Sequence, residues 1–370
     1  MNDGLALTPP MGWNSWNAFG MDVDEAKIRG AADALVRQGL KAAGYEYVVV
    51  DDGWAGRRDG AGDLHPDPVR FPGGIPALAD YVHSRGLKFG LYTDVGPKTC
   101  GGLAGSLGHE EQDAARFASW GVDYVKADWC HHEGLNARLI YGRWRDALKA
   151  TGRPIVFSIC CWGEQSPWHW GAETGHLWRT TLDVFPCWDC GDVHGNAGWP
   201  VQLEKNVGLE PYHGPGHWND PDMLQCGNAG LTDGEGRAQF SMWCVLGAPL
   251  LAGNDLGGMS DFTRETLTNP EALAVNQDPL GAMGRLVWDM GGGAQVWAKA
   301  LRAEGEFGAA LFNRGDSPAE ITLHWHDLRV RMAEMDVRDL WAHQDLGRFG
   351  GGFTATVAPH EARLLKVSAP

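Results

Sequence analysis

Basic residues are scarce in this sequence. The chain of 370 residues has 31 lysines and arginines against 47 aspartates and glutamates, which gives a formal net charge of -16. A charge of this sign repels phosphate backbones and anionic lipid headgroups, so we expect neither nucleic acid nor a membrane surface as a partner. The sequence also lacks an apolar run of the roughly 20 residues that a membrane-spanning helix needs.

Targeting signals and cysteine-rich patterns are missing as well. The first ten residues, MNDGLALTPP, contain no basic segment followed by an apolar one, so we expect a soluble chain, either cytoplasmic or secreted with its signal already removed. The eight cysteines are scattered along the chain, which excludes a disulfide-built scaffold and permits one or two bridges. We find no internal repeat and no low-complexity linker.

Tryptophan, in contrast, is abundant. Its 18 residues outnumber both the 7 tyrosines and the 12 phenylalanines. Most indoles fill protein cores, but an indole also offers a flat apolar face to the C–H groups of a sugar ring. Carbohydrate is therefore one ligand class that the composition favours.

Apolar, strand-like runs recur eight times in the first three quarters of the chain, with helical patterns between them. The interval 25–44 shows this pattern, because its apolar residues recur at helical spacing and a glycine ends it. Such alternation indicates a parallel sheet covered by helices, and eight units close a (β/α)8 TIM barrel of about 250 residues. The eight runs are 11–16, 45–54, 88–94, 124–129, 154–160, 177–183, 217–223 and 248–255.

The pattern changes after NQDPLG at 276–281. Apolar residues now alternate with polar ones, for example at 321–326 and 353–357, which is typical of antiparallel strands with one buried face. We therefore predict an α/β chain with a (β/α)8 barrel domain over residues 1–282 and a small antiparallel β-sandwich over residues 283–370.

Polar residues gather where the predicted strands end. In a (β/α)8 enzyme the chemistry lies at the carboxyl ends of the strands. A helix cap or a turn explains any one of these residues, but it does not easily explain carboxylates on six strands. The residues in question are Asp51, Asp52, Tyr92, Asp94, Lys126, Asp128, Arg179, Asp183, Asp220, Asp222, Asn254 and Asp255.

Two kinds of chemistry fit a barrel mouth lined by carboxylates: divalent metal binding and glycoside cleavage. A metal site would favour strand histidines, whereas His131 and His132 follow a strand and are interpreted as solvated loop residues. The segment HEEQD at 109–113 lacks the second histidine of a zinc helix. CWDC at 187–190 has redox spacing, but in a barrel loop it indicates a structural bridge or free thiols. We therefore predict no metal and no cofactor.

Glycoside cleavage needs two carboxyl groups that face one anomeric carbon. Lys126 precedes Asp128 by two residues and shares its strand face, so its charge is expected to keep that carboxylate ionised. Asp183, four residues after Arg179, is the best-placed second carboxyl.

Eight motifs resemble one family, glycoside hydrolase family twenty-seven, which contains retaining α-galactosidases and α-N-acetylgalactosaminidases. They follow the family order and span the whole predicted barrel. The motifs are MGWNSWNAFG (11–20), VDDGW (50–54), GLKFGLYTDVGPKTCGG (86–102), GVDYVKADWC (121–130), WRTTLDV (178–184), WNDPDML (218–224), APLLAGNDL (248–256) and AVNQDPLG (274–281).

The resemblance implies roles for individual residues. Asp128 would be the nucleophile and Asp183 the general acid/base. Cys100 and Cys130 would form a disulfide, which favours an oxidising compartment and hence secretion. The sugar pocket would be lined by Trp16, Asp51, Asp52, Tyr92, Cys100, Lys126, Cys160, Cys161, Trp162, Arg179, Asp222 and Met223.

The same resemblance implies which sugar hydroxyls these side chains would bind. Asp51 and Asp52 would take the 4- and 6-hydroxyls, and Lys126 the 3- and 4-hydroxyls. Arg179 and Asp222 would face the 2-position.

One departure from the family pattern concerns the sugar 2-position. Cys161 stands where animal relatives have Glu or Ser, and its small side chain leaves room for a substituent larger than hydroxyl. The resemblance implies an exo-acting, retaining α-galactosidase that acts by double displacement on a carbohydrate with a terminal α-galactoside. An α-N-acetylgalactosaminidase and a β-L-arabinopyranosidase on the same scaffold remain as alternatives. The sequence indicates no oligomeric state.

Overall fold

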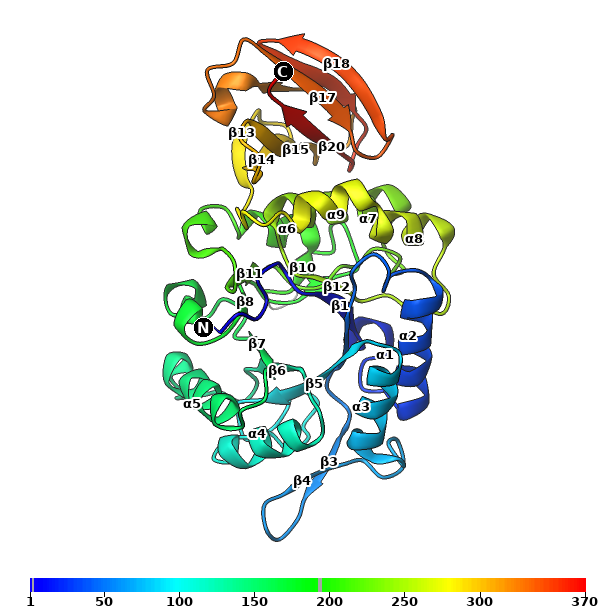
Figure 1. Ribbon diagram of the computed structural model, residues 1–370, viewed down its shortest axis with the longest axis vertical. Coiled ribbons are helices and arrows are strands. Elements are labelled where there is room, and N and C mark those ends of the chain that lie inside the picture. The colour runs from blue at the N-terminus through cyan, green and yellow to red at the C-terminus, as the bar shows by residue number, and fades with distance from the viewer. Residues whose placement is uncertain (2, 192–194) are drawn as a thin grey trace.

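Eight parallel strands form the barrel sheet of the first domain. The computed structural model describes residues 1, 3–191 and 195–370. Each of the eight predicted runs contains one strand of this sheet, which confirms the predicted TIM barrel (Figure 1). The strands are β1 (Met11–Asn14), β2 (Tyr47–Val50), β5 (Lys88–Asp94), β6 (Tyr124–Asp128), β7 (Val156–Ile159), β8 (Leu177–Arg179), β11 (Trp218–Asp220) and β12 (Leu250–Ala252).

The barrel has a seam between β11 and β12. The hydrogen-bonded order runs β11-β8-β7-β6-β5-β2-β1-β12, so these two strands end the sheet. A parallel bridge between Leu224 and Ala252 joins them just beyond β11. Three short strand pairs lie outside this sheet: β3 (Ala55–Arg58) with β4 (Leu64–Pro66), β9 (Val184–Phe185) with β10 (Ala197–Gly198), and β16 with β19 of the second domain.

Alternation along the barrel strands separates an inner core from an outer one. On β2, Tyr47 and Val49 belong to a small apolar cluster inside the barrel, whereas Val48 and Val50 pack in the larger core under the helices. Both faces of a parallel strand are thus apolar, which is why the runs stand out in the sequence.

Helices cover the outside of the barrel. Their ends follow capping rules: Thr232 and Glu235 form a capping box at the start of α7, and Gly247 ends that helix in the left-handed conformation with φ 68°. The helices are α1 (Trp16–Phe19), α2 (Glu25–Arg37), α3 (Gly74–Ser84), α4 (Glu110–Ser119), α5 (Ala137–Ala150), α6 (Trp199–Glu204), α7 (Asp233–Leu246), α8 (Asp261–Thr268) and α9 (Pro270–Asn276). Short 3-10 turns span Pro167–His169, Gly171–Glu173, Glu210–Tyr212 and Trp325–Leu328.

The second domain is an antiparallel β-sandwich, as predicted. A six-stranded sheet of order β13-β14-β15-β20-β17-β18 packs against the pair β16 and β19 around one apolar cluster. The predicted boundary after residue 282 stays a prediction, and the first strand of this sheet starts at Arg285. The strands are β13 (Arg285–Asp289), β14 (Ala294–Ala300), β15 (Glu306–Asn313), β16 (Ala319–His324), β17 (Glu334–Asp339), β18 (Gln344–Gly350), β19 (Gly352–Val357) and β20 (Ala362–Ser368).

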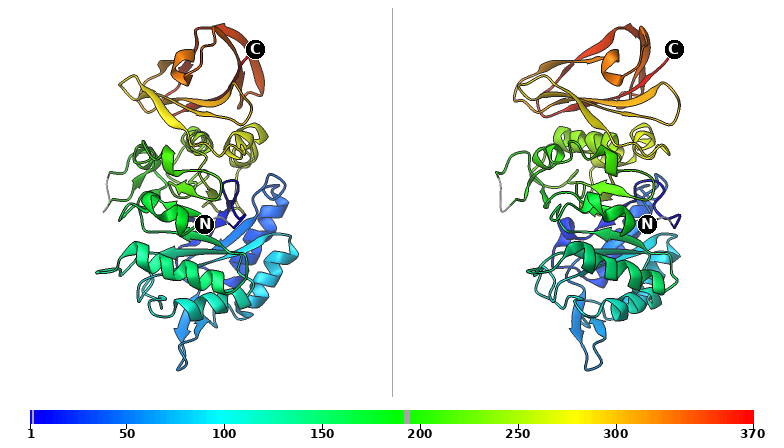
Figure 2. Two further views of the ribbon diagram at one scale, coloured as in Figure 1. Left: turned by 60° about the vertical axis from the view of Figure 1, so that its left-hand side comes forward. Right: turned by 90° about the vertical axis from the view of Figure 1, so that its left-hand side faces the viewer.

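The sandwich stacks on the side of the barrel that carries α6 to α9, so the molecule is elongated (Figures 1 and 2). Polar bonds cross this junction. The buried Lys299 Nζ donates to the carbonyl of Val275 at 2.9 Å, and Trp341 Nε1 donates to Ser241 Oγ at 3.0 Å. Burial lowers the pKa of Lys299 to about 8.

Two disulfides tie loops of the barrel. Cys100 bonds Cys130 across 30 residues, as the family resemblance implied, and Cys187 bonds Cys190 across 3 residues. Within the described residues, no helix has both the length and the apolar character that crossing a bilayer requires.

The two disulfides should differ in their effect on stability. In the chain-entropy view, a bridge that closes a 30-residue loop stabilises by about 3 to 4 kcal/mol, and one that closes a 3-residue loop by about 1 to 2 kcal/mol. The Cys100→Ser/Cys130→Ser double variant should therefore lose more free energy of unfolding in urea titrations than Cys187→Ser/Cys190→Ser. Equal losses would contradict the assignment of the longer bridge as the main cross-link.

Candidate active site

The carboxyl ends of β2, β5, β6, β8 and β11 bring their polar side chains to one mouth of the barrel. Strand β6 shows why. Val125 and Ala127 pack in the outer core and Tyr124 lies in the inner cluster, so Lys126 and Asp128 share the inner face with Tyr124. The sequence prediction that these two side chains point the same way is consistent with this arrangement.

Lys126 makes its ion pair with Asp51 rather than with Asp128. Its Nζ lies 2.8 Å from Asp51 Oδ2, and Asn14 Nδ2 donates to the same oxygen at 2.7 Å. The ammonium also lies 5.2 Å from the ring centroid of Tyr92. The expected influence of Lys126 on Asp128 is therefore one of charge alone, because the hydrogen bond of Lys126 goes to Asp51. Spacing along one strand revealed the shared face but not the partner on β2.

Asp128 is held by two N–H groups on one oxygen. The Trp129 backbone N–H and Trp162 Nε1 donate to Oδ1 at 3.0 and 2.9 Å, while Oδ2 accepts no hydrogen bond from any described residue. Burial raises the pKa of this carboxyl, and the charge of Lys126 is the largest influence that opposes the rise. The arrangement fixes the carboxyl and leaves one oxygen available to an electrophile.

Arg179 joins the second candidate carboxyl to the mouth. Its Nη2 lies 2.9 Å from Asp183 Oδ1, and its Nη1 lies 3.1 Å from Asp222 Oδ1. The Asp183 side chain is 44% exposed, whereas Arg179 is buried. Burial acts to raise the pKa of Asp183, but the charge of Arg179, the charge of Lys126 and the hydrogen bond of Arg179 together hold that pKa below its usual range.

Asp222 occupies a strained backbone position. Its φ of 81° is uncommon for a residue with a side chain, and strain of this kind gathers at functional sites. The Val184 N–H donates to Asp222 Oδ2 at 2.8 Å, and the backbone N–H of Asp222 donates to Asp220 Oδ1 at 2.9 Å. These bonds hold Asp222 beside Arg179 and against Val184, the residue after Asp183 at which β9 begins.

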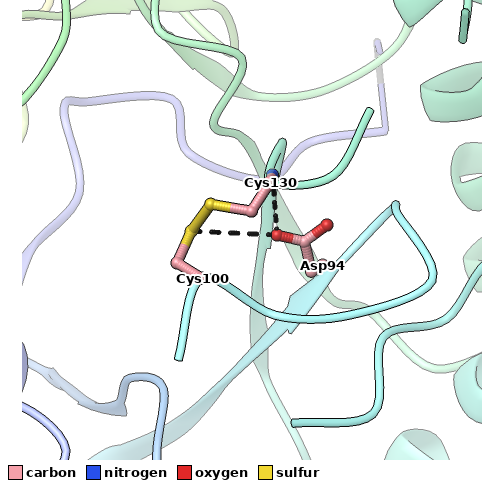
Figure 3. A group of neighbouring side chains, drawn as sticks. All are labelled: Asp94, Cys100 and Cys130. Carbon is pink, nitrogen blue, oxygen red and sulfur yellow. Dashed lines mark hydrogen bonds between the residues drawn. A yellow bond between two sulfur atoms is a disulfide. The ribbon is translucent and has the colours of Figure 1, made fainter. Parts of the chain in front are cut away.

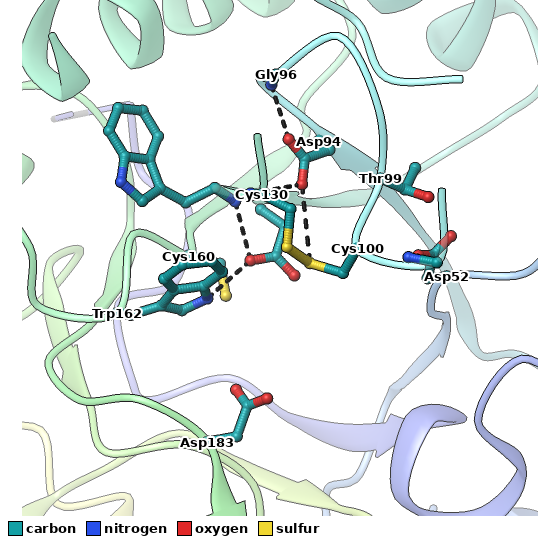
Figure 4. Close-up of a disulfide and its surroundings, with 12 residues drawn as sticks. Asp52, Asp94, Gly96, Thr99, Cys100, Cys130, Cys160, Trp162 and Asp183 are labelled. Atoms are coloured by element: carbon teal, nitrogen blue, oxygen red, sulfur yellow. Dashed lines mark hydrogen bonds between the residues drawn. A yellow bond between two sulfur atoms is a disulfide. The ribbon is translucent and has the colours of Figure 1, made fainter. Parts of the chain in front are cut away.

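The opposite wall contains Asp52 and the Cys100–Cys130 disulfide (Figure 4), and Tyr92 contacts this disulfide. Asp52 Oδ2 accepts from the Gly101 N–H at 2.7 Å, and Tyr92 OH lies 3.5 Å from Cys100 Sγ. Burial raises the pKa of Asp52. The disulfide thus holds the loop after β5 against the carboxyls of β2. Figure 4 also shows Asp183 across the opening from Cys160 and Trp162.

Asp94 is a site residue to which sequence reasoning gave no role. It is fully buried at the end of β5, in register with Asp128 on β6. Its two oxygens accept from the N–H groups of Gly96 at 2.7 Å and Cys130 at 2.9 Å (Figure 4). Burial, followed by the neighbouring charge of Asp128, raises its pKa to about 8. Its place at a strand end was the available signal.

Asp94 also lies near the sulfurs of Cys100 and Cys130 (Figure 3). Among the described residues, these three form the one group whose potential metal-ligand atoms lie close together. Those sulfurs are joined in a disulfide and are not thiolate ligands. His132 stacks on Trp129 with ring centroids 4.6 Å apart. Neither group has the donor set of a metal centre.

Cys160 and Cys161 have different surroundings. Cys161 is fully buried and packs in the outer core, whereas its neighbour Cys160 lies with its sulfur 3.6 Å from Arg179 Nη1. Both residues follow the end of β7. The burial of Cys161 weighs against extra room at the sugar 2-position, and its place in the sugar pocket stays a prediction.

The remaining predicted pocket residues border the inner cluster. Trp16 is half-buried there, and its backbone N–H donates to Asn14 Oδ1 at 2.8 Å. Met223 is buried in the same cluster. Trp162 has φ 56°, a left-handed conformation that turns its indole back toward Asp128.

Comparison with known proteins agrees with this geometry. Residues 8–278 match the family described as alpha galactosidase A, and residues 291–367 match its C-terminal beta sandwich domain. Alpha-galactosidase A of Cellvibrio japonicus is 50% identical over 324 residues, which are 87% of this chain and 80% of that protein.

Two solved structures are also similar to this chain. Alpha-galactosidase I of Mortierella vinacea superposes with a TM-score of 0.96 at 37% identity and covers 99% of this chain and 98% of its own. A β-L-arabinopyranosidase of Geobacillus stearothermophilus, solved with arabinose, has a TM-score of 0.88 at 28% identity over 99% and 98% of the two chains. With both domains matched in order, this chain belongs to the α-galactosidase family, glycoside hydrolase family twenty-seven.

Proposed function

We propose that this protein is an exo-acting, retaining α-galactosidase that removes terminal α-D-galactose by double displacement. One observation carries the proposal. A fixed, buried carboxyl with one unpaired oxygen, Asp128, and a half-exposed carboxyl, Asp183, come from different strands to the same barrel mouth. Retention requires a nucleophile and an acid/base in this relation, about 5 to 5.5 Å apart.

In the proposed first step Asp128 Oδ2 attacks the anomeric carbon. The glycosidic C–O bond breaks, and Asp183 gives its proton to the departing oxygen. In the second step Asp183 takes a proton from water, which attacks the same carbon and releases Asp128. Each galactosyl transfer inverts the anomeric centre, so the product keeps the α configuration.

The negative charge of Asp183 acts to raise the pKa of Asp128, so the protonation of one carboxyl affects the other. In the free enzyme Arg179 holds Asp183 ionised and burial favours the proton on Asp128. The reaction needs the reverse arrangement. We propose that the bound sugar takes hydrogen bonds from Arg179, which weakens its hold on Asp183 and moves the proton to the acid/base.

Recognition of galactose is assigned to the buried polar side chains of the mouth. Asp51 and Asp52 would accept from the 4- and 6-hydroxyls, Lys126 would donate to the 3- and 4-hydroxyls, and Arg179 with Asp222 would face the 2-position. The first two are at most 2% exposed, so any hydroxyl that reaches them is withdrawn from water. A buried donor or acceptor left without its hydroxyl costs about 1 to 3 kcal/mol, which gives the site its selectivity.

The two alternative activities have weaker support. Burial of Cys161 weighs against a pocket enlarged at the 2-position, on which the α-N-acetylgalactosaminidase reading depended. The Asp51–Asp52 pair suits a 6-hydroxyl, which L-arabinopyranose lacks. We also propose an oxidising location outside the cytoplasm, because the Cys100–Cys130 bond would not persist in reduced cytosol.

Initial rates on three p-nitrophenyl glycosides test the assignment. We expect α-D-galactoside to be cleaved faster than α-D-N-acetylgalactosaminide and β-L-arabinopyranoside, with α-galactose as the first product in proton NMR. Asp128→Asn should lower kcat by at least about 10³-fold because no covalent step remains. As a matched control, Asp255→Asn alters another strand-end carboxyl that is exposed and bonds its own loop at Gly257. Preference for another glycoside, or near-normal turnover by Asp128→Asn, would overturn the proposal.

The pH profile of Arg179→Gln tests the electrostatics of the pair. Loss of the guanidinium removes the strongest influence that lowers the pKa of Asp183, so that carboxyl should keep its proton to higher pH. The basic limb of kcat/KM should therefore move to higher pH even as the rate falls. Arg179→Lys keeps a positive charge and should move the limb less. An unmoved basic limb in Arg179→Gln would show that Arg179 does not set the protonation of the acid/base.

A further inference from the structure

The loop that follows Asp183 reaches the β-sandwich domain through one side chain, Trp188. Its ring lies nearly parallel to the imidazole of His360, with centroids 4.0 Å apart and an interplanar angle of 13°. It also makes edge-to-face contacts with Trp199 of α6 and Phe312 of β15, with ring centroids 5.2 and 6.0 Å away. Trp188 therefore sits between the two domains, five residues after Asp183.

His360 bonds a carboxylate of each domain. Its Nδ1 lies 2.9 Å from Glu235 Oε1 in α7, and its Nε2 lies 3.0 Å from Asp316 Oδ1 in the sandwich. A neutral imidazole has a single N–H, so both contacts are hydrogen bonds only when the ring carries two protons. The ring also stacks on the indole face of Trp188. These contacts fix the imidazole as a flat support for Trp188.

The backbone around Trp188 is closely packed against two glycines. A Cβ atom added at Gly198 would lie 2.3 Å from the Trp188 carbonyl oxygen, and one added at Gly230 would lie 2.1 Å from the Pro186 carbonyl oxygen. The segment 186–188 is thus pressed against β10 and the loop at 230. Because β10 pairs with β9, a shift of Trp188 is passed to the strand that begins at Val184.

Asp183 depends on that strand pair for its position. Its side chain is bonded by Arg179 alone among the described residues. Its backbone N–H donates to Asn196 Oδ1 at 2.9 Å, and its carbonyl accepts from Gln202 Nε2 at 3.2 Å. Both of these partners come from the chain around β10 and α6, on which the Trp188 segment rests.

We propose that Trp188 and His360 are positioning residues through which the β-sandwich domain holds Asp183 at the sugar pocket. The inference rests on the proposed function, in which Asp183 is the proton donor. It gives the second domain a part in the reaction, although none of its residues reaches the mouth through any contact described above.

The test compares leaving groups that differ in their need for a proton. With kcat/KM as the readout, only the first step is measured, in which Asp183 protonates the departing oxygen. A 2,4-dinitrophenyl α-galactoside needs no such proton, whereas a galactosyl-glucose disaccharide does. In Trp188→Ala and His360→Ala we expect kcat/KM on the disaccharide to fall about tenfold or more while the activated substrate changes within about twofold, because misplacement costs acid catalysis.

Two further variants sharpen the comparison. Trp188→Phe keeps an aromatic ring and should recover part of the lost ratio. His343→Ala breaks another histidine contact between the domains, at 2.6 Å from Glu271 Oε1, and should leave the ratio unchanged. The ratio of the two substrates does not depend on the fraction of active enzyme, so partial misfolding lowers both values alike.

The outcomes separate the inference from the proposed function. If Trp188→Ala and His360→Ala reduce both substrates by one factor, or neither, the positioning role is overturned. If the wild-type protein cleaves neither galactoside, the proposed function itself fails. Added azide, which needs no base to attack the glycosyl-enzyme, should raise kcat on the activated substrate in both alanine variants and not in His343→Ala.

Discussion

The chemistry of the barrel mouth depends on one constraint: buried carboxyl groups there outnumber the positively charged side chains. The barrel mouth gathers Asp51, Asp52, Asp94, Asp128, Asp183, Asp220 and Asp222 around Lys126 and Arg179. Burying unpaired charge is costly, so some of these carboxyls must hold protons at neutral pH. Burial raises the pKa of Asp94 to about 8 and that of Asp220 to about 6. A retaining glycosidase needs one ionised carboxyl as the nucleophile and one protonated carboxyl as the acid, so the redistribution of protons when the sugar binds is part of the proposed mechanism.

The sequence predicted the scaffold well because barrel strands are apolar on both faces. Each run that it marked contains a strand, and the strand-end carboxylates followed from the rule that parallel strands end together. Partnership across strands was harder to predict. The ion pair of Lys126 with Asp51 joins residues 75 apart, and no spacing along one strand reveals it. Cys160 and Cys161 differ by one position, and the sequence did not show that their surroundings differ.

Composition was a weaker guide than position. The abundance of tryptophan suggested sugar binding, yet most of the indoles are buried in the hydrophobic core, for example Trp54, Trp144 and Trp297. Trp162 differs because its backbone is left-handed and its Nε1 reaches a carboxylate. The interdomain contacts of Lys299 and Trp188 left no pattern in the sequence, since each residue serves a surface formed only when both domains are complete.

The pairing of β1 with β12 has a consequence for how the chain is made. Strand β1 pairs with β12, and Trp13 Nε1 donates to the carbonyl of Asn254, a partner 241 residues away. During synthesis β1 must therefore wait for β12, the last strand of the barrel, before the two can pair. Contacts of such long sequence separation slow folding. Helices α7 to α9 arise around the same stage and are the surface on which the sandwich docks, so closure of the barrel and assembly of the two domains belong to one late event in biosynthesis.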